Sequence, residues 1–300
     1  MVMGSFVPAR EIRALRDLTR RRTELVTSRG QEAQRLEKEL EDTGMKLSSV
    51  LSDITGASGR AILGALIAGE RDPEALAELA VRRASRKIPA LIEALDGQFT
   101  GHHAFMCRHF LEEIDHLTSA ADRIDARITA LLARLGHERA VADLDTIPGV
   151  GLAAAQIIVA ETGGDMAQFA TAGHLASWIG VCPGMNESAG VAKSGRTRQG
   201  NSNLKRVLGV AAMAAIRDKD CYLSAYYRRI AARRGRRRAQ VAVMHKIAIA
   251  IWHILRDKTT YQDLGADYFT RRDPERAMRR MAKEANRLGL TVRFEPTPAS

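Results

Sequence analysis

The sequence is poor in aromatic residues and in cysteine. Aromatic residues make up 5% of its 300 residues against 45% hydrophobic residues in total, so the core must consist mainly of Leu, Ile, Val and Ala. Such a composition favours helices packed on helices. The cysteines, Cys107, Cys182 and Cys221, are three in number and far apart. They indicate neither a zinc site nor a disulfide framework, and a reducing cytoplasm is the expected compartment.

The sequence also lacks the features of a membrane or secreted protein. No apolar run approaches the roughly 20 residues that a spanning helix needs, and the N-terminus shows no signal pattern. Metal-ligand spacing is absent as well. His245 and His253 lie eight residues apart with no carboxylate or cysteine near enough to complete a motif, so we expect core or surface histidines and no metal site.

Positive charge is abundant and concentrated in one block. The chain has a net charge of +11, and residues 191–240 hold 14 basic residues against two acidic ones, Asp218 and Asp220. A localised block of this size indicates a polyanionic partner. DNA or RNA is the natural candidate, and an anionic membrane surface is the competitor that the lack of apolar runs disfavours.

The spacing of apolar residues predicts a mostly α fold. Long antiparallel, coiled-coil-like helices with a small helical insert should be followed by a helical domain with a helix-hairpin-helix-like motif. For the first long helix, an ordinary surface helix is an equally good interpretation. The predicted divisions are a remnant of a preceding domain (1–9), a connector (10–136) with its insert (48–100), a C-terminal domain (141–262) and a charged, partly disordered tail (263–300).

A glycine turn opens the C-terminal domain. The sequence Pro148-Gly149-Val150-Gly151 precedes a helix of small residues, which is the pattern of a helix-hairpin-helix. Backbone N–H groups at such a helix start bind a DNA phosphate without reading the base sequence. Gly149 and Gly151 are therefore candidate nucleic-acid contacts, although similar turns occur in inert helical hairpins.

Residues 180–206 form the most informative segment. They combine Gly, Pro, Ser and Asn with five cations in a loop that leads into an apolar helix. No core needs this mixture, whereas a loop that handles phosphate does. The candidate contacts in this segment are Lys193, Arg196, Arg198, Asn201, Lys205 and Arg206.

An arginine-rich stretch follows, with tyrosines that offer stacking surfaces. A solvated charged face is the simplest interpretation, but so many neighbouring arginines repel one another without a partner, so we favour nucleic-acid contact. The candidate contacts here are Arg228, Arg229, Arg233, Arg234, Arg236, Arg237 and Arg238.

These motifs, in this order between Val141 and Tyr261, resemble the C-terminal transposase domain of the IS110/IS116 insertion-sequence transposases. Residues 10–135 resemble the coiled-coil connector of the same proteins. The resemblance implies a DNA recombinase, guided in some members by a structured RNA, that uses a serine nucleophile for strand cleavage and exchange. The matching serine is Ser188; Ser194 and Ser202 are nearby alternatives. Many relatives have Ser-Ser-Gly-Gly here, so Glu187 and Ala189 are departures.

The resemblance also implies an N-terminal RuvC-like domain with four acidic metal ligands, which would bind Mg²⁺ in a full-length member. This chain offers no matching acidic tetrad and binds no cofactor by this interpretation; Asp17, Glu24 and Glu32 look like solvated charges. Lys193, Arg196 and Arg198 can stabilise charge that develops on a phosphoryl group attacked by Ser188.

We therefore expect a truncated transposase, inactive alone, in the cytoplasm at the nucleoid. Its expected partners are the DNA of element ends and target, a structured guide RNA and further copies of itself, with no membrane. The alternative is a non-catalytic helix-hairpin-helix and Arg-rich nucleic-acid-binding protein. A purely structural coiled-coil protein would leave the basic block unexplained.

Overall fold

Helices dominate the computed structural model, which describes residues 8–184, 187–192 and 195–295, and the prediction of a mostly α fold is confirmed. The chain divides into two compact units. We call Asp17–Ala130 the connector unit, and Met1–Arg16 with Leu131–Ser300 the C-terminal unit. Residues 10–16 and 131–136, which the sequence analysis assigns to the connector, group with the C-terminal unit here, and the predicted domain bounds stay predictions.

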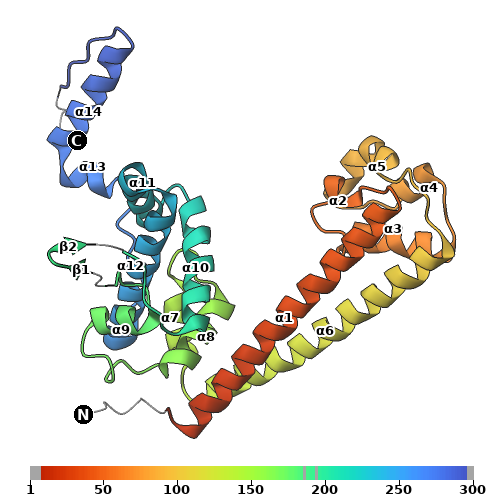
Figure 1. Ribbon diagram of the computed structural model, residues 1–300, viewed down its shortest axis with the longest axis horizontal. Coiled ribbons are helices and arrows are strands. Elements are labelled where there is room, and N and C mark those ends of the chain that lie inside the picture. Colours follow the sequence, from red (N-terminus) through yellow and green to blue (C-terminus); the bar gives the residue numbers. More distant parts are fainter. Residues whose placement is uncertain (1–7, 185–186, 193–194, 296–300) are drawn as a thin grey trace. The chain divides into compact units, whose positions relative to one another are not determined.

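The connector unit is built on two long antiparallel helices, α1 (Arg10–Asp42) and α6 (Gly101–Arg134) (Figure 1). The first residues of α1, up to Arg16, and the last residues of α6, from Leu131, belong to the C-terminal unit. Inside the unit, buried Arg22 reaches Asp125 across the pair, with Nη1 2.5 Å from Oδ1. This ion pair joins the helices; a coiled coil in the strict sense stays a prediction.

Short helices fill the insert between these two. They are α2 (Leu47–Val50), α3 (Ala57–Ala68), α4 (Pro73–Glu78), a 3₁₀ helix (Arg82–Lys87) and α5 (Ile88–Ala94). Asp72 caps α4 by accepting a hydrogen bond from the backbone N–H of Glu74, and Pro73 takes the first helical position, as the sequence predicts. Leucines and isoleucines of α1 and of the insert form one core, which includes Leu36, Leu40, Ile62, Leu66, Leu76 and Leu91.

The C-terminal unit packs around α12 (Arg236–Asp257), which contacts α7, α9, α10 and α11. The remaining elements are α7 (Glu138–Asp145), α8 (Leu152–Thr162), α9 (Ala172–Ile179), β1 (Glu187–Ser188), β2 (Val191–Ala192), α10 (Ser202–Arg217) and α11 (Tyr222–Arg234). Buried Trp252 of α12 donates its indole N–H to the carbonyl oxygen of Phe169 at 2.8 Å, which fixes the loop before α9. This core is the platform for the segment between α9 and α10.

The tail expected to be partly disordered includes two helices, α13 (Tyr268–Arg272) and α14 (Pro274–Arg287). Stacked rings hold α13 to α11: the Phe269 ring lies 5.6 Å from Tyr222 and 6.3 Å from Tyr226. The guanidinium of Arg229 lies 4.8 Å from the centre of the Phe269 ring. The expectation of disorder came from the charged composition of the tail and its Pro-Thr-Pro ending, which do not show that Phe269 packs on residues of α11.

Within the described part of the chain, no helix is both long enough and apolar enough to cross a membrane.

Ile62→Ala tests the core of the connector unit. Ile62 is fully buried, so the substitution should lower the free energy of unfolding by about 2–5 kcal/mol. Gly64→Ala on the same helix is the control, because an added Cβ there meets no atom within 4 Å, and it should stabilise by about 0.5–1 kcal/mol. Urea unfolding followed by circular dichroism measures both, and equal shifts would contradict this packing.

Candidate nucleic-acid interface

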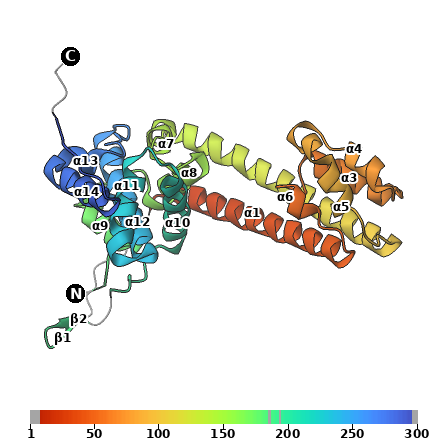
Figure 2. The ribbon, with the colours of Figure 1, turned by 90° about the horizontal axis from the view of Figure 1, so that it is seen from above.

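The segment between α9 and α10 is a β-hairpin, called here the hairpin 181–200. Near its base the N–H of Gly184 donates to the carbonyl oxygen of Arg196 at 3.0 Å, and Pro183 and Thr197 form an antiparallel bridge. Further out, β1 and β2 pair antiparallel, with Ser188 opposite Val191. Figure 2 shows this ribbon standing away from the helices of the C-terminal unit. The sequence predicted a loop here, and the structure makes it a projecting arm.

The backbone of Ser188 lies at the tip of this arm, as the last residue of β1 before the turn. The turn residues Ala189 and Gly190 have φ values of 53° and 75°. Two left-handed residues in a two-residue loop are the hallmark of a tight hairpin turn of type I′. Ala189 is thus a strained residue next to the candidate nucleophile. Lys193 and Ser194, also singled out in the sequence, lie outside the described residues.

Two glycines hold the base of the hairpin together. A Cβ on Gly200 would lie 2.4 Å from the carbonyl carbon of Ile179, and one on Gly180, whose φ is +84°, would lie 2.9 Å from the carbonyl oxygen of Arg198. The N–H of Asn201 also donates to the carbonyl oxygen of Trp178 at 3.2 Å. The two ends of the hairpin therefore run in direct backbone contact, which only residues without a side chain allow.

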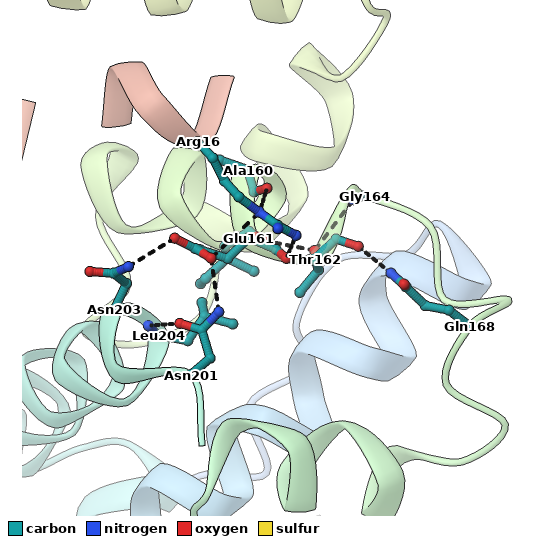
Figure 3. Close-up of polar contacts among 10 residues, drawn as sticks. Arg16, Ala160, Glu161, Thr162, Gly164, Gln168, Asn201, Asn203 and Leu204 are labelled. Carbon is teal, nitrogen blue, oxygen red and sulfur yellow. Dashed lines mark hydrogen bonds and ion pairs between the residues drawn. The ribbon is translucent and has the colours of Figure 1, made fainter. Parts of the chain in front are cut away.

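A buried carboxylate anchors this base to the rest of the unit (Figure 3). Glu161, near the end of α8, is 0% exposed. Its Oε2 accepts a hydrogen bond from the side-chain amide of Asn201 at 2.8 Å, and its Oε1 accepts one from Asn203 at 3.2 Å. The Nε of Arg16, on α1, lies 3.5 Å from Oε2 and donates to the carbonyl oxygen of Ala160 at 3.1 Å. We call these four side chains the Glu161 network.

Sequence reasoning missed Glu161 and Arg16. The available signal was one carboxylate in the otherwise apolar end of a small-residue helix, Gln156-Ile-Ile-Val-Ala-Glu161. Charged residues are rarely buried without a partner, so a carboxylate in this apolar run indicates a buried polar contact. Its partners are distant in sequence and no spacing pattern points to them.

Two of the predicted contact residues are engaged inside the protein. Besides binding Glu161, Asn201 caps α10, since its side-chain oxygen accepts the N–H of Leu204 at 3.0 Å. The Nζ of Lys205 donates to the hydroxyl of Thr197 at 2.9 Å and to the carbonyl oxygen of Arg198 at 3.1 Å. Arg196, Arg198 and Arg206 are exposed beside them. A direct contact of Asn201 or Lys205 with nucleic acid stays a prediction.

The glycine turn before α8 places its two glycines differently. Gly149 has a φ of +84°, and a Cβ there would lie 2.2 Å from the carbonyl oxygen of Ala211, so its Cα packs against α10. Gly151 is the N-cap residue of α8 and has open space around it. Close packing therefore explains Gly149 without any ligand, and phosphate binding at the turn stays a prediction for both glycines.

The arginine-rich stretch forms the corner between α11 and α12. Arg233 and Arg234 end α11, Gly235 turns the chain with a φ of +82°, and Arg236, Arg237 and Arg238 make up the first turn of α12, which holds no acidic residue. All five are exposed. A helix N-terminus carries partial positive charge and is destabilised by cations. This arrangement costs stability and suits an anionic partner.

Arg228 and Arg229 lie further back on α11 and are partly occupied. Arg228 donates to the carbonyl oxygen of Lys219 at 3.1 Å, and Arg229 stacks on Phe269. Burial, followed by the neighbouring Tyr226 and Tyr268, raises the pKa of Tyr222 above its usual value. The Tyr222 side chain beside these arginines thus stays uncharged at neutral pH and offers no repulsion to phosphate.

Across residues 8–184, 187–192 and 195–295, no three His, Cys, Asp or Glu side chains gather as they would around a metal ion. The side chains described here therefore do not fit a Mg²⁺ site of their own.

Residues 141–228 match the model of a protein family described as the transposase IS116/IS110/IS902 family. This segment of the chain is therefore similar to the proteins of that family. The match begins in α7, includes the hairpin 181–200 and the Glu161 network apart from Arg16, and ends within α11. The glycine turn and the hairpin of the sequence analysis lie inside this match, whereas most of the arginine-rich stretch, from Arg229 to Arg238, lies beyond its end.

Curated relatives are insertion-element proteins. The chain is 29% identical over 190 residues to an uncharacterized 43.6 kDa protein of IS110 from Streptomyces coelicolor, covering 61% of this chain and 46% of that protein. It is 26% identical over 269 residues to a 42 kDa protein of IS900 from Mycobacterium paratuberculosis, covering 82% and 65%. It is also 32% identical over 123 residues to the IS1111A transposase of Coxiella burnetii, covering 40% and 34%. The chain thus spans between one third and two thirds of the length of these transposon proteins.

Gly200→Ala tests the base of the hairpin 181–200. Because the new Cβ would collide with backbone atoms, we expect a loss of about 3 kcal/mol in the free energy of unfolding of the C-terminal unit. Gly173→Ala in α9 is the matched control, since its Cβ would meet only the Thr171 hydroxyl at 3.7 Å. Thermal unfolding that is unchanged in Gly200→Ala would show that the two ends of the hairpin do not touch.

Proposed function

We propose that the C-terminal unit is a transposase domain that binds insertion-element DNA, and that Ser188 attacks a DNA phosphodiester. The observation that carries the proposal is the position of Ser188, at the tip of a projecting hairpin inside the matched family domain. A nucleophile on such an arm can reach a backbone phosphate of a duplex while the helices stay outside the grooves. The exposed cations Arg196, Arg198 and Arg206 follow along the same segment.

The proposed reaction is a transesterification. The serine oxygen forms a bond to phosphorus, the bond from phosphorus to one sugar oxygen breaks, and the serine proton ends on that leaving oxygen. A sugar hydroxyl of another strand reverses the step, so strands are exchanged without loss of phosphodiester energy. Guanidinium groups near the hairpin stabilise the charge that develops on the phosphoryl oxygens, which is the main form of catalysis open to such a site.

The proposed binding partners follow from this reaction. Exchange of several strands needs several serines, so we propose that further copies of the chain assemble on element ends and target DNA, in the cytoplasm at the nucleoid. A structured guide RNA is the third proposed partner. The corner of α11 and α12 supplies charge that any polynucleotide backbone would satisfy, which supports nucleic-acid binding without selecting DNA over RNA.

Ser188→Ala separates the enzyme from a protein that only binds nucleic acid. With labelled element-end DNA, and with a full-length family member present to supply the metal-binding domain that the resemblance implies, the wild-type chain should form a covalent protein–DNA adduct of its own size that survives denaturing electrophoresis. Ser188→Ala should lower its formation at least about a thousandfold, as loss of a nucleophile does in other enzymes, and leave DNA affinity unchanged. Ser202→Ala is the control and should retain the adduct. An adduct that persists in Ser188→Ala would refute the assignment.

Charge reversal at the start of α12 tests the arginine corner. Replacing Arg236, Arg237 and Arg238 by Glu should weaken DNA binding and reduce the slope of log K against log salt by up to about three, since each lost phosphate contact removes about 0.9. The same change should raise helix stability by about 0.3–1 kcal/mol per residue, because acidic groups suit a helix N-terminus.

Reversal of Arg82, Arg83 and Arg86 in the connector unit removes equal charge and is the control for this experiment. These three arginines are exposed on the 3₁₀ helix. We expect a smaller change of salt slope from them, measured by fluorescence anisotropy from 50 to 300 mM salt. Equal slopes for both triple variants would show that net charge alone governs binding.

A further inference from the structure

We propose that Glu161 is a positioning residue for the hairpin that carries Ser188. Its carboxylate fixes the point at which the hairpin ends and α10 begins, and it connects that point to α1 through Arg16. The part of this inference that concerns DNA cleavage rests on the proposed function; the part that concerns the hairpin does not.

The geometry concentrates three attachments on Asn201. Its side-chain amide donates to Glu161, its side-chain oxygen accepts the N–H of Leu204, and its backbone N–H donates to the carbonyl oxygen of Trp178. One residue therefore joins α8, the first turn of α10 and the end of α9. Without the Glu161 carboxylate, the side-chain amide of Asn201 has no acceptor to hold its orientation. The hydrogen bonds that Asn201 makes with Leu204 and Trp178 are then less well aligned.

Asn203 gives Glu161 a second attachment on the same helix. Asn201 and Asn203 occupy the N-cap and the second position of α10, and each bonds a different carboxylate oxygen. Two bonds from one carboxylate to one helix start fix the rotation of the helix as well as its distance. The rotation of α10 sets the direction of Lys205, which in turn bonds Thr197 and Arg198 of the returning hairpin strand.

A carboxylate is an expensive way to fill this space. Burying an ionised group costs several kcal/mol, and an apolar residue of similar size is often neutral or better for stability. Glu161 is fully buried, and its charge is met by Arg16 and two amide donors. Such satisfied polar networks favour one arrangement over its competitors. An apolar side chain in place of Glu161 could not accept these hydrogen bonds and would therefore not fix the hairpin.

A series of contacts within the C-terminal unit connects this network to the hairpin that carries Ser188. The network fixes Asn201, the adjoining Gly200 packs on the backbone of Ile179, and the N–H of Gly184 bonds Arg196 further out. Each of these contacts constrains the described residues on either side of it. We infer that displacement at Asn201 is transmitted as a change in the direction of the arm rather than as unfolding of the core.

Glu161→Gln tests the inference without changing the shape of the side chain. The new amide is a donor facing the donors of Asn201, Asn203 and Arg16, so at least one bond is lost. We expect amide hydrogen exchange in residues 196–204 to speed up by about tenfold, the equivalent of one hydrogen bond, with exchange in α12 unchanged. Asn203→Ala keeps the buried charge and should give a smaller increase in the same residues.

Thr162→Val is the matched control. Thr162 is the next residue, is also 0% exposed, and uses its hydroxyl only within its own segment, towards Ile158 and Gly164. It should leave exchange in residues 196–204 as in the wild type. Exchange that is unchanged in Glu161→Gln, or that rises equally throughout the unit or in Thr162→Val, overturns the inference, because Glu161 would then be an ordinary core residue.

A second measurement connects the network to the reaction. In Glu161→Gln the rate of adduct formation with element-end DNA should fall at least about tenfold, while the Kd changes less than about threefold because the arginine corner supplies most affinity. An equal loss in affinity and rate overturns the positioning role. If the wild type forms no adduct, the proposed function fails, and the hydrogen-exchange result still decides whether Glu161 positions the hairpin.

Discussion

The backbone contact between the two ends of the hairpin 181–200 is the constraint on which the candidate site depends. Gly180 and Gly200 allow the chain to leave α9 and return to α10 at van der Waals distance. Without that contact the arm would be a long loop, whose ordering would cost about 1–2 kcal/mol per residue in backbone entropy alone. This contact only brings the two ends of the hairpin together, and we propose that the Glu161 network fixes the direction in which the hairpin projects. Together they turn a polar, glycine-rich segment into a support for Ser188.

Electrostatics in this domain follow a different logic from its packing. The core of the C-terminal unit is built from aliphatic residues with a few well-placed aromatic rings, and its energetics need no partner. The arginine corner, in contrast, sets five exposed guanidinium groups around one glycine at the positive end of α12. Evolution commonly accepts such local cost where function requires it. The buried residues of α12 therefore serve stability, while the proposed binding falls to the arginines at its first turn.

Much of this structure could be predicted from the sequence, and the part that could not has an identifiable cause. Period and composition predicted the long helices, the Asp72 cap and a helical C-terminal domain, because these features are encoded by neighbours in sequence. The hairpin base and the Glu161 network were missed, since Arg16, Glu161 and Asn201 are joined only by the tertiary fold. Gly149 illustrates a third case. The sequence marks it as a candidate phosphate contact, and the structure shows that its close packing on Ala211 is by itself a reason for glycine at this position.

Ala189 gives the hairpin an uneven stiffness. Its φ of 53° costs an L-residue roughly 1–2 kcal/mol relative to glycine, and this cost falls at the outermost residues of the arm. Other conformations of the tip are correspondingly closer in energy, whereas the base, with its glycine contact and buried carboxylate, has no such alternatives. Among the described residues, the hairpin thus combines a constrained base with a strained turn, and a change of conformation at this turn would leave the helices that carry the hairpin undisturbed.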